Sequence, residues 1–153
     1  QPIFKTWRDA KKLLFAHVGE SQTESNVTTA ISHLGVTEIN HGIKACGCAD
    51  ILELANDYNC CFHMALRSNE CTNVIGSNPD GSDNPWHPIT KMVRSNLVTI
   101  GTDDPVQCRT NIKSEFELAE KYFKLDHYSD FETNEAIDKL RRTAADRIRM
   151  SRR

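Results

Sequence analysis

The sequence predicts an α/β fold built from consecutive parallel βα units. Short apolar runs of strand length alternate along the chain with longer stretches in which apolar residues recur at helical spacing. Polar residues able to take part in chemistry follow several of these apolar runs. Because parallel α/β barrels keep their chemistry at the carboxyl ends of the strands, this pattern gathers those residues at one face.

The first half of the chain contains two such units. Residues 13–16 form the first apolar run, and residues 25–34 carry four apolar side chains at helical spacing before a glycine. A short strand is expected over residues 36–40. Residues 49–58 are expected to form an amphipathic helix, because their apolar residues share one helical face.

The second half continues the pattern. Residues 60–66 predict a third strand, and residues 97–100 predict the last one. Between them, residues 76–85 are rich in Gly, Pro, Asn, Asp and Ser, which indicates a surface loop beside the site. A helix is expected over residues 87–95.

Two amphipathic helices, residues 112–125 and 131–148, are expected to close the chain. From Lys139 to Arg153 there are seven basic residues against Asp146, although the formal net charge of the whole chain is −2. No aromatic residues are interleaved with these basic residues, so a solvated terminal helix is favoured over a nucleic-acid surface.

Composition is ordinary for a globular domain, with 39% hydrophobic and 26% charged residues. No apolar run approaches the ~20 residues of a membrane span, and no signal segment opens the chain, so no membrane partner is expected. The spacing of the six cysteines does not suggest a disulfide framework. Reduced thiols in a cytoplasmic protein are therefore expected.

The apolar run at residues 97–100 is followed by Thr102-Asp103-Asp104-Pro105. Far upstream stand His17-Val18-Gly19-Glu20 and Asn40-His41-Gly42, each after a predicted strand. Together these segments supply metal ligands, an acid/base group and an orienting acid. That set is typical of a metal-assisted hydrolase.

In order along the chain, these segments resemble the C-terminal half of the adenosine and AMP deaminase family, zinc enzymes on a (β/α)8 barrel. The family's strands end in H-x-G-E, in G-H-G or S-H-G, in P-x-S-N and in T-D-D-P. The matching segments here are His17-Val18-Gly19-Glu20, Asn40-His41-Gly42, Leu66-Arg67-Ser68-Asn69 and Thr102-Asp103-Asp104-Pro105. Asn40 and Leu66 depart from the pattern, since Gly or Ser and Pro are usual there.

The resemblance implies that residues 1–153 form a single partial domain, the C-terminal half of a TIM (β/α)8 barrel with about four βα units and terminal helices. An eight-stranded barrel typically takes ~250 residues, more than this chain has. The family's H-x-H zinc ligands do not occur in the sequence. We therefore expect a separate N-terminal half, in the same polypeptide or a second chain, and the pattern is compatible with a homo-oligomer.

By the same resemblance, His17 and Asp103 are zinc ligands and Glu20 moves protons between the attacking water and the purine. His41 steadies the nucleophile without ligating the metal. Asp104 holds a ring nitrogen of the substrate. Taken singly, these residues would more often be rim histidines, a solvated Glu or an Asp helix cap; four segments in order favour the catalytic interpretation.

Two further residues are expected at the substrate. Arg67 could take a phosphate oxygen pair bidentately, and Gln107 follows the carboxylate pair in a sequence slightly closer to the AMP branch. His87 is expected to be structural. Glu20 and Asp104 are expected to contact the purine as well as to act in catalysis.

The sequence therefore predicts a zinc-dependent hydrolase that deaminates a 6-aminopurine nucleoside or nucleotide, of the adenosine, AMP or ATP type. An alternative is a non-catalytic barrel fragment that serves as a structural or oligomerisation subunit. The intact H-x-G-E and T-D-D-P segments argue against this alternative, because a scaffold has no physical need for two buried carboxylates that cost desolvation. A larger multidomain nucleotide deaminase, with its barrel regulated by another domain, is also compatible with the sequence.

Overall fold

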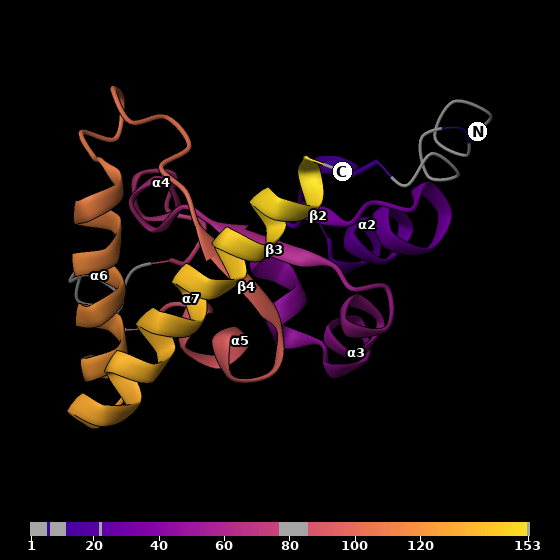
Figure 1. Cartoon of the computed structure of the whole chain (residues 1–153). Helices are drawn as coiled ribbons and strands as arrows, with labels where there is room; N and C mark the ends of the chain where they lie inside the picture. The colour runs from indigo at the N-terminus through magenta and orange to yellow at the C-terminus, as the bar shows by residue number, and fades with distance from the viewer. Residues whose placement is uncertain (1–5, 7–11, 22, 77–85, 153) are drawn as a thin grey trace.

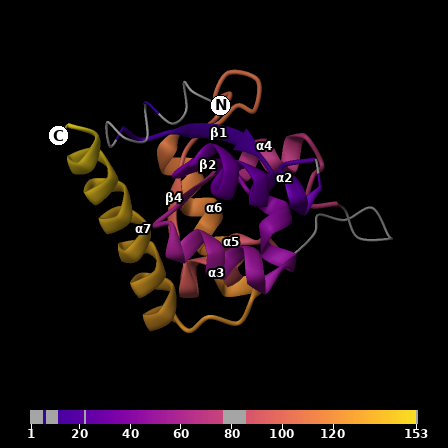
Figure 2. The same ribbon diagram turned by 90° about the vertical axis from the view of Figure 1, so that its right-hand side faces the viewer.

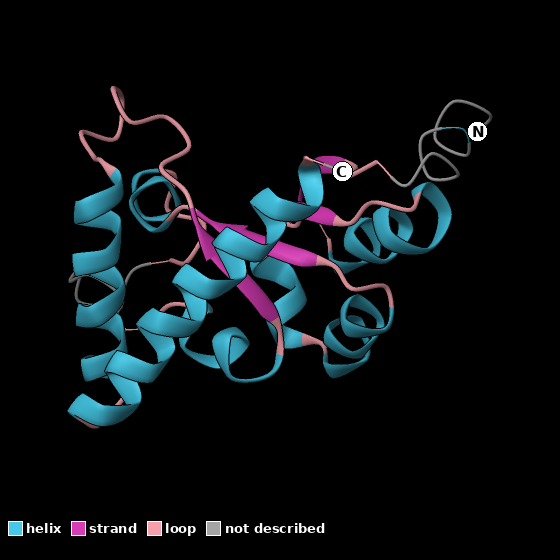
Figure 3. Cartoon of the chain, viewed as in Figure 1, coloured by secondary structure: helices cyan, strands magenta, loops and turns pink. Residues whose placement is uncertain are grey.

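Four parallel strands form the centre of the molecule, as expected. The computed structural model describes residues 6, 12–21, 23–76 and 86–152. The strands lie side by side in sequence order (Figures 1 and 3). They are β1 (Phe15–Val18), β2 (Glu38–His41), β3 (Cys61–Met64) and β4 (Leu97–Ile100).

Helices surround this sheet on more than one side. They are α2 (Glu24–Thr29), α3 (Ala49–Asp57), α4 (Leu66–Cys71), α5 (Ile89–Ser95), α6 (Ile112–Leu125) and α7 (Asp130–Ser151), with a π turn at Ala30–Leu34 and a 3₁₀ turn at Ile43–Gly47. Figure 2 shows α7 on one side of the strands and α2 and α3 on the other. Among the described residues, every helix is too short or too polar to cross a bilayer.

Most predicted elements are confirmed, but several boundaries were wrong: β2 begins at Glu38 instead of residue 36, and α7 extends to Ser151 instead of residue 148. The first strand lies two residues later than expected, so that His17 belongs to β1 instead of following it. The third strand stops at Met64, because a helix that the sequence did not predict, α4, begins at Leu66. Of the predicted loop, residues 77–85 lie outside the described residues.

The start of α4 is held by a side chain from a distant element. Glu115 on α6 is wholly buried, and its Oε2 accepts hydrogen bonds from the backbone N–H groups of Leu66 (2.8 Å) and Arg67 (3.2 Å). Its Oε1 accepts from Thr110 Oγ1 (2.7 Å). A carboxylate at this position satisfies N–H groups that the first helical turn leaves without intrahelical partners.

Alternating residues give the sheet two different faces. Ile39, Phe62 and Val98 are paired across β2, β3 and β4 and are almost wholly buried in the apolar core. The adjacent register row is polar and runs through His17, Asn40, His63 and Thr99. Because successive side chains on a strand point to opposite faces, this polar row lies on the face opposite the core.

A buried ion pair ties α7 to the sheet. Arg147 donates to the carboxylate of Glu38 and to the carbonyls of Thr37 (3.0 Å) and Asn59 (3.1 Å). His63 Nε2 contacts the other Glu38 oxygen at 2.7 Å. Glu38, Cys61 and His63 present metal-type ligand atoms within 4.8 Å of one another, but Arg147 already neutralises Glu38. We therefore regard this cluster as structural.

His87, just before α5, is wholly buried. Its Nδ1 accepts a hydrogen bond from the Ile89 backbone N–H (3.1 Å), and its ring packs on Tyr122 with centroids 5.2 Å apart. Desolvation by burial lowers the pKa of His87 from 6.5 to about 3. The ring is therefore neutral in the folded protein near neutral pH.

The Arg147–Glu38 pair predicts a large stability effect. Arg147→Met would leave the buried Glu38 carboxylate without its cation, so the free energy of unfolding should fall by ~3–5 kcal/mol. Arg149→Met is the matched control on the same helix. Arg149 pairs with exposed Asp146, so its loss should change stability by about 0.5 kcal/mol or less. Urea denaturation of both variants measures the difference, and equal effects would contradict the structural role of the pair.

His87 predicts a loss of stability in mild acid. The unfolded chain binds a proton at His87 below pH 6.5, whereas the folded chain does not until about pH 3. Stability should therefore fall as pH drops through this window, with a contribution approaching ~1.4 kcal/mol per pH unit. Denaturation between pH 7.5 and pH 4.5 should show a shallower slope for His87→Gln, whereas exposed His33→Gln should retain the wild-type slope.

Candidate active site

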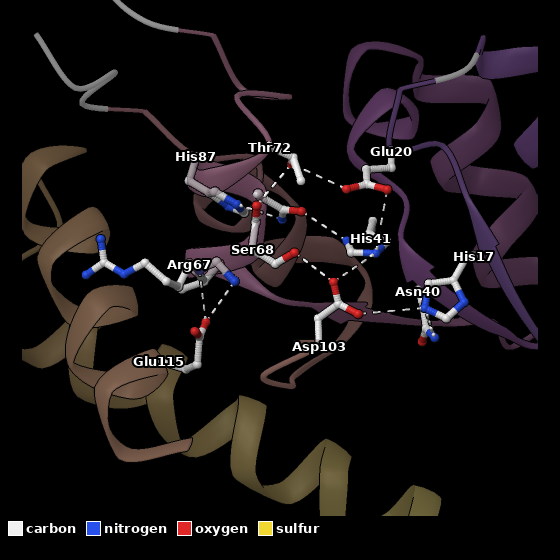
Figure 4. Close-up of polar contacts among 12 residues, drawn as sticks. His17, Glu20, Asn40, His41, Arg67, Ser68, Thr72, His87, Asp103 and Glu115 are labelled. Atoms are coloured by element: carbon white, nitrogen blue, oxygen red, sulfur yellow. Dashed lines mark hydrogen bonds and ion pairs between the residues drawn. The ribbon is translucent and has the colours of Figure 1, made fainter. Parts of the chain in front are cut away.

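Four of the predicted site residues converge at the carboxyl ends of the strands. His17 is on β1, Glu20 follows it, His41 ends β2, and Asp103 follows β4. The Nε2 atom of His41 lies 3.9 Å from Glu20 Oε2 and 3.8 Å from Asp103 Oδ2. The other Asp103 oxygen lies 3.9 Å from His17 Nε2, as Figure 4 shows.

Left-handed backbone at the end of β2 places His41. His41 has φ 67° and Gly42 has φ 66°, a conformation in which a residue with a large side chain is uncommon. A Cβ on Gly42 would lie 2.5 Å from Cδ1 of Phe62, so only glycine fits there. Such locally unfavourable backbone is found most often at functional sites, where the surrounding structure holds it.

Asp103 has a defined orientation. It too has a positive φ, 52°, and Ser68 Oγ on α4 donates to its Oδ2 (2.7 Å). The carboxylate therefore presents one oxygen toward His41 and the other toward His17. This orientation suits Asp103 as an anionic metal ligand that lies between His17 and His41 on two different strands.

Glu20 is held from the opposite side of the cluster. Thr72 Oγ1 donates to Glu20 Oε1 (3.3 Å), and Oε2 faces His41. The Glu20 side chain is 28% exposed, so it remains accessible to a substrate and to water. A carboxylate in this position can accept a proton from a group between it and His41.

Behind His41 lies a buried polar chain that the sequence did not predict. His41 Nδ1 contacts the Asn69 carboxamide at 3.0 Å, and the same carboxamide contacts His87 Nε2 at 3.2 Å. All three residues are buried. The chain connects the centre of the site to the start of α5.

The donor set fits a divalent metal ion. His17, His41 and Asp103 each offer a ligand atom, and these atoms lie within 4.8 Å of one another. Imidazole nitrogen and carboxylate oxygen are ligands that zinc accepts. In the structure Asn40 Nδ2 contacts His17 Nε2 at 3.1 Å, so a metal ligated by that nitrogen would replace this contact.

A cavity of about 440 Å³ adjoins the cluster, a volume suited to a small molecule. Glu20, Asp103, Asp104 and Gln107 line it. Asp104 and Gln107, both predicted at the substrate, therefore line the same cavity as Glu20.

Arg67 is the one predicted site residue that the structure does not bring to the cluster. Its guanidinium pairs with Glu70 on α4 and points away from Glu20 and His41 (Figure 4). Conversely, Ser68 and Asn69 were identified only as part of a motif, without roles. Thr72 had no signal in the sequence, because only the fold brings it to Glu20.

Comparison with known proteins agrees with this geometry. The sequence pattern of the adenosine deaminase family matches residues 1–147. An adenine deaminase from Rhizobium rhizogenes is 31% identical over 132 residues, which are 86% of this chain and 38% of that protein. An adenosine deaminase from Photorhabdus laumondii is 30% identical over 120 residues, 78% of this chain and 34% of that protein.

Solved structures show the same architecture. An amidohydrolase from Burkholderia ambifaria with bound Zn matches 97% of this chain and 43% of its own, with a TM-score of 0.66 at 23% identity. An adenine deaminase from Arthrobacter aurescens matches 94% of this chain and 47% of its own, with a TM-score of 0.54 at 19% identity. The chain thus spans less than half the length of these relatives, and its sheet is part of an α/β barrel. The chain belongs to the adenosine deaminase family.

Proposed function

We propose that this chain supplies the C-terminal half of the catalytic site of a zinc-dependent deaminase acting on 6-aminopurines. The observation that carries the proposal is the convergence of His17, Glu20, His41 and Asp103 beside a cavity that Asp104 also lines. The reaction is hydrolytic, so that water replaces the 6-amino group and ammonia leaves.

The metal would be held from this chain by His17 and Asp103. When bound, zinc supplies Lewis acidity and lowers the pKa of water. The further ligands that a catalytic zinc site requires would come from the N-terminal half of the barrel. The relative with bound Zn supports this choice of metal.

The chain's own residues would divide the remaining work. Glu20 would take a proton from the attacking water and deliver it to a purine ring nitrogen, and Thr72 orients its carboxylate for this transfer. Asp104 would accept or donate a hydrogen bond at another ring nitrogen and so orient the base. His41 would support the nucleophile from the side opposite the substrate.

The names of the relatives and the pairing of Arg67 both bear on the class of substrate. The relatives carry the names adenine deaminase and adenosine deaminase, so the 6-aminopurine ring is the common element. A 5′ phosphate is the weaker proposal, because Arg67 is paired with Glu70. Comparing kcat/KM for adenine, adenosine, AMP and ATP in the complete protein tests it, and a preference for AMP or ATP would support a phosphate contact.

The division of roles between Glu20 and Asp103 predicts two distinct inactive variants. Glu20→Gln keeps size and hydrogen bonding but removes the proton acceptor, so bound zinc should remain while kcat falls by at least ~10²-fold. Asp103→Asn removes an anionic ligand, so zinc and activity should be lost together. Metal analysis and deamination assays separate the two, and a Glu20→Gln enzyme with wild-type turnover would refute the proton-transfer role.

The shared zinc site predicts that metal affinity depends on both halves. The 153-residue chain offers two of the expected ligands, fewer than the three that catalytic zinc sites generally take from protein. Isothermal titration should therefore give weak zinc binding to this chain and one-to-one binding to the protein with both halves. Tight stoichiometric zinc on this chain alone would contradict the proposal.

A further inference from the structure

A series of buried hydrogen bonds lies behind His41, and the donor and the acceptor in each of them can be assigned. It begins at the backbone N–H of Ile89, passes through His87 and Asn69, and ends at His41 Nδ1, with contacts of 3.1, 3.2 and 3.0 Å. His87 and Asn69 are wholly buried, and His41 is 2% exposed. Each polar atom in this chain therefore depends on its neighbour for a hydrogen bond.

The first link has only one possible direction. A backbone N–H donates and cannot accept, so His87 Nδ1 must carry a lone pair. Burial keeps the pKa of His87 far below neutral, so the ring holds a single proton. That proton is on Nε2, and His87 Nε2 is a donor toward Asn69.

The second link fixes the Asn69 carboxamide. Its oxygen and nitrogen exchange places by a half-turn about the terminal torsion, with little change in shape, so hydrogen bonds decide its orientation. The structure places Nδ2 toward His87 and Oδ1 toward His41. With His87 Nε2 protonated, this arrangement makes two donors face each other in a buried site, and each is left unsatisfied at ~1–3 kcal/mol. The orientation that satisfies both neighbours has Oδ1 toward His87 and Nδ2 toward His41.

We propose that Asn69 and His87 are positioning residues that fix the tautomer of His41. In the half-turned orientation, Asn69 Nδ2 donates to His41 Nδ1, so neutral His41 carries its proton on Nε2. That N–H faces the space between Glu20 Oε2 (3.9 Å) and Asp103 Oδ2 (3.8 Å). Neither distance is a direct hydrogen bond, so the N–H is available to an oxygen atom bound between these carboxylates.

The tautomer of His41 decides whether this residue can ligate a metal or can only donate a hydrogen bond, a choice that distances alone leave open. His41 is close enough to His17 and Asp103 to complete a set of three metal ligands. A protonated Nε2 has no lone pair for a metal, so His17 and Asp103 remain the ligands from this chain. Under the proposed function, on which this step rests, His41 donates a hydrogen bond to the oxygen of the attacking water.

The test reads the tautomer directly. Long-range ¹H–¹⁵N correlation spectra of the complete protein, labelled with ¹⁵N-histidine and recorded at pH 7.5, distinguish protonated from unprotonated ring nitrogens. We expect His41 with Nε2 protonated and Nδ1 unprotonated, and His87 with the same pattern. A proton on His41 Nδ1, or protons on both nitrogens, would overturn the proposal whatever the activity of the protein.

Asn69→Asp reverses the last link, because a carboxylate accepts at both ends. His41 should then carry its proton on Nδ1, with kcat reduced by ~10²-fold and KM changed by about twofold or less. Asn96→Asp is the matched control: Asn96 is equally buried, and its amide donates to Leu52 O and Asn56 Oδ1, away from the site. It should keep the wild-type His41 tautomer and keep kcat within about twofold. Asn96 lies outside the series of hydrogen bonds from Ile89 through His87 and Asn69 to His41, which we call the relay.

The outcomes distinguish the relay from the proposed function. If Asn69→Asp keeps the proton on His41 Nε2, the relay is wrong. If it does not fold, the wild-type spectrum decides. A protein that shows the expected tautomers but does not deaminate purines would refute the proposed function and retain the relay, whereas an active deaminase with His41 Nδ1 protonated would refute only the relay.

Discussion

The left-handed turn at the end of β2 is the constraint on which the site depends. It turns the chain sharply after Asn40, so that the His41 ring meets Asn69 on one side and the two carboxylates on the other. Phe62 leaves no room for a side chain on Gly42, and Gly19 approaches the same turn closely. The ends of β1, β2 and β3 are therefore fixed relative to one another by backbone packing, before any side-chain hydrogen bond forms.

Local sequence patterns predicted most of the fold, because strands and amphipathic helices reflect periodicity within a short window. The last strand and the helix at Ile112–Leu125 lie where they were predicted. The sequence did not indicate α4. Its first turn depends on Glu115, 49 residues away from Leu66, and no window of local sequence contains that interaction. The limits of β1 depend likewise on its pairing with β2.

For the site, the sequence motifs identified the residues that converge at the ends of the strands, but they did not identify the residues that hydrogen-bond to them from behind. His17, Glu20, His41 and Asp103 converge as expected, because each lies near the carboxyl end of a parallel strand or just beyond it. Ser68, Asn69 and Thr72 approach these groups from a helix that local sequence did not predict. Arg67 was expected at the cavity from its neighbours in sequence, but successive residues on a helix point in different directions.

One consequence concerns the order in which the site comes apart. β1 is an edge strand of the described sheet, and the side chain of His17 on it is 65% exposed. Strands with one neighbour open locally at lower free energy than central strands, and their amides exchange with solvent first. Fraying of β1 would separate His17 from Asp103 while His41, Asn69 and His87 stayed packed. A neighbouring strand that covered this edge would therefore retain a bound ion by suppressing local opening, without contributing any ligand itself.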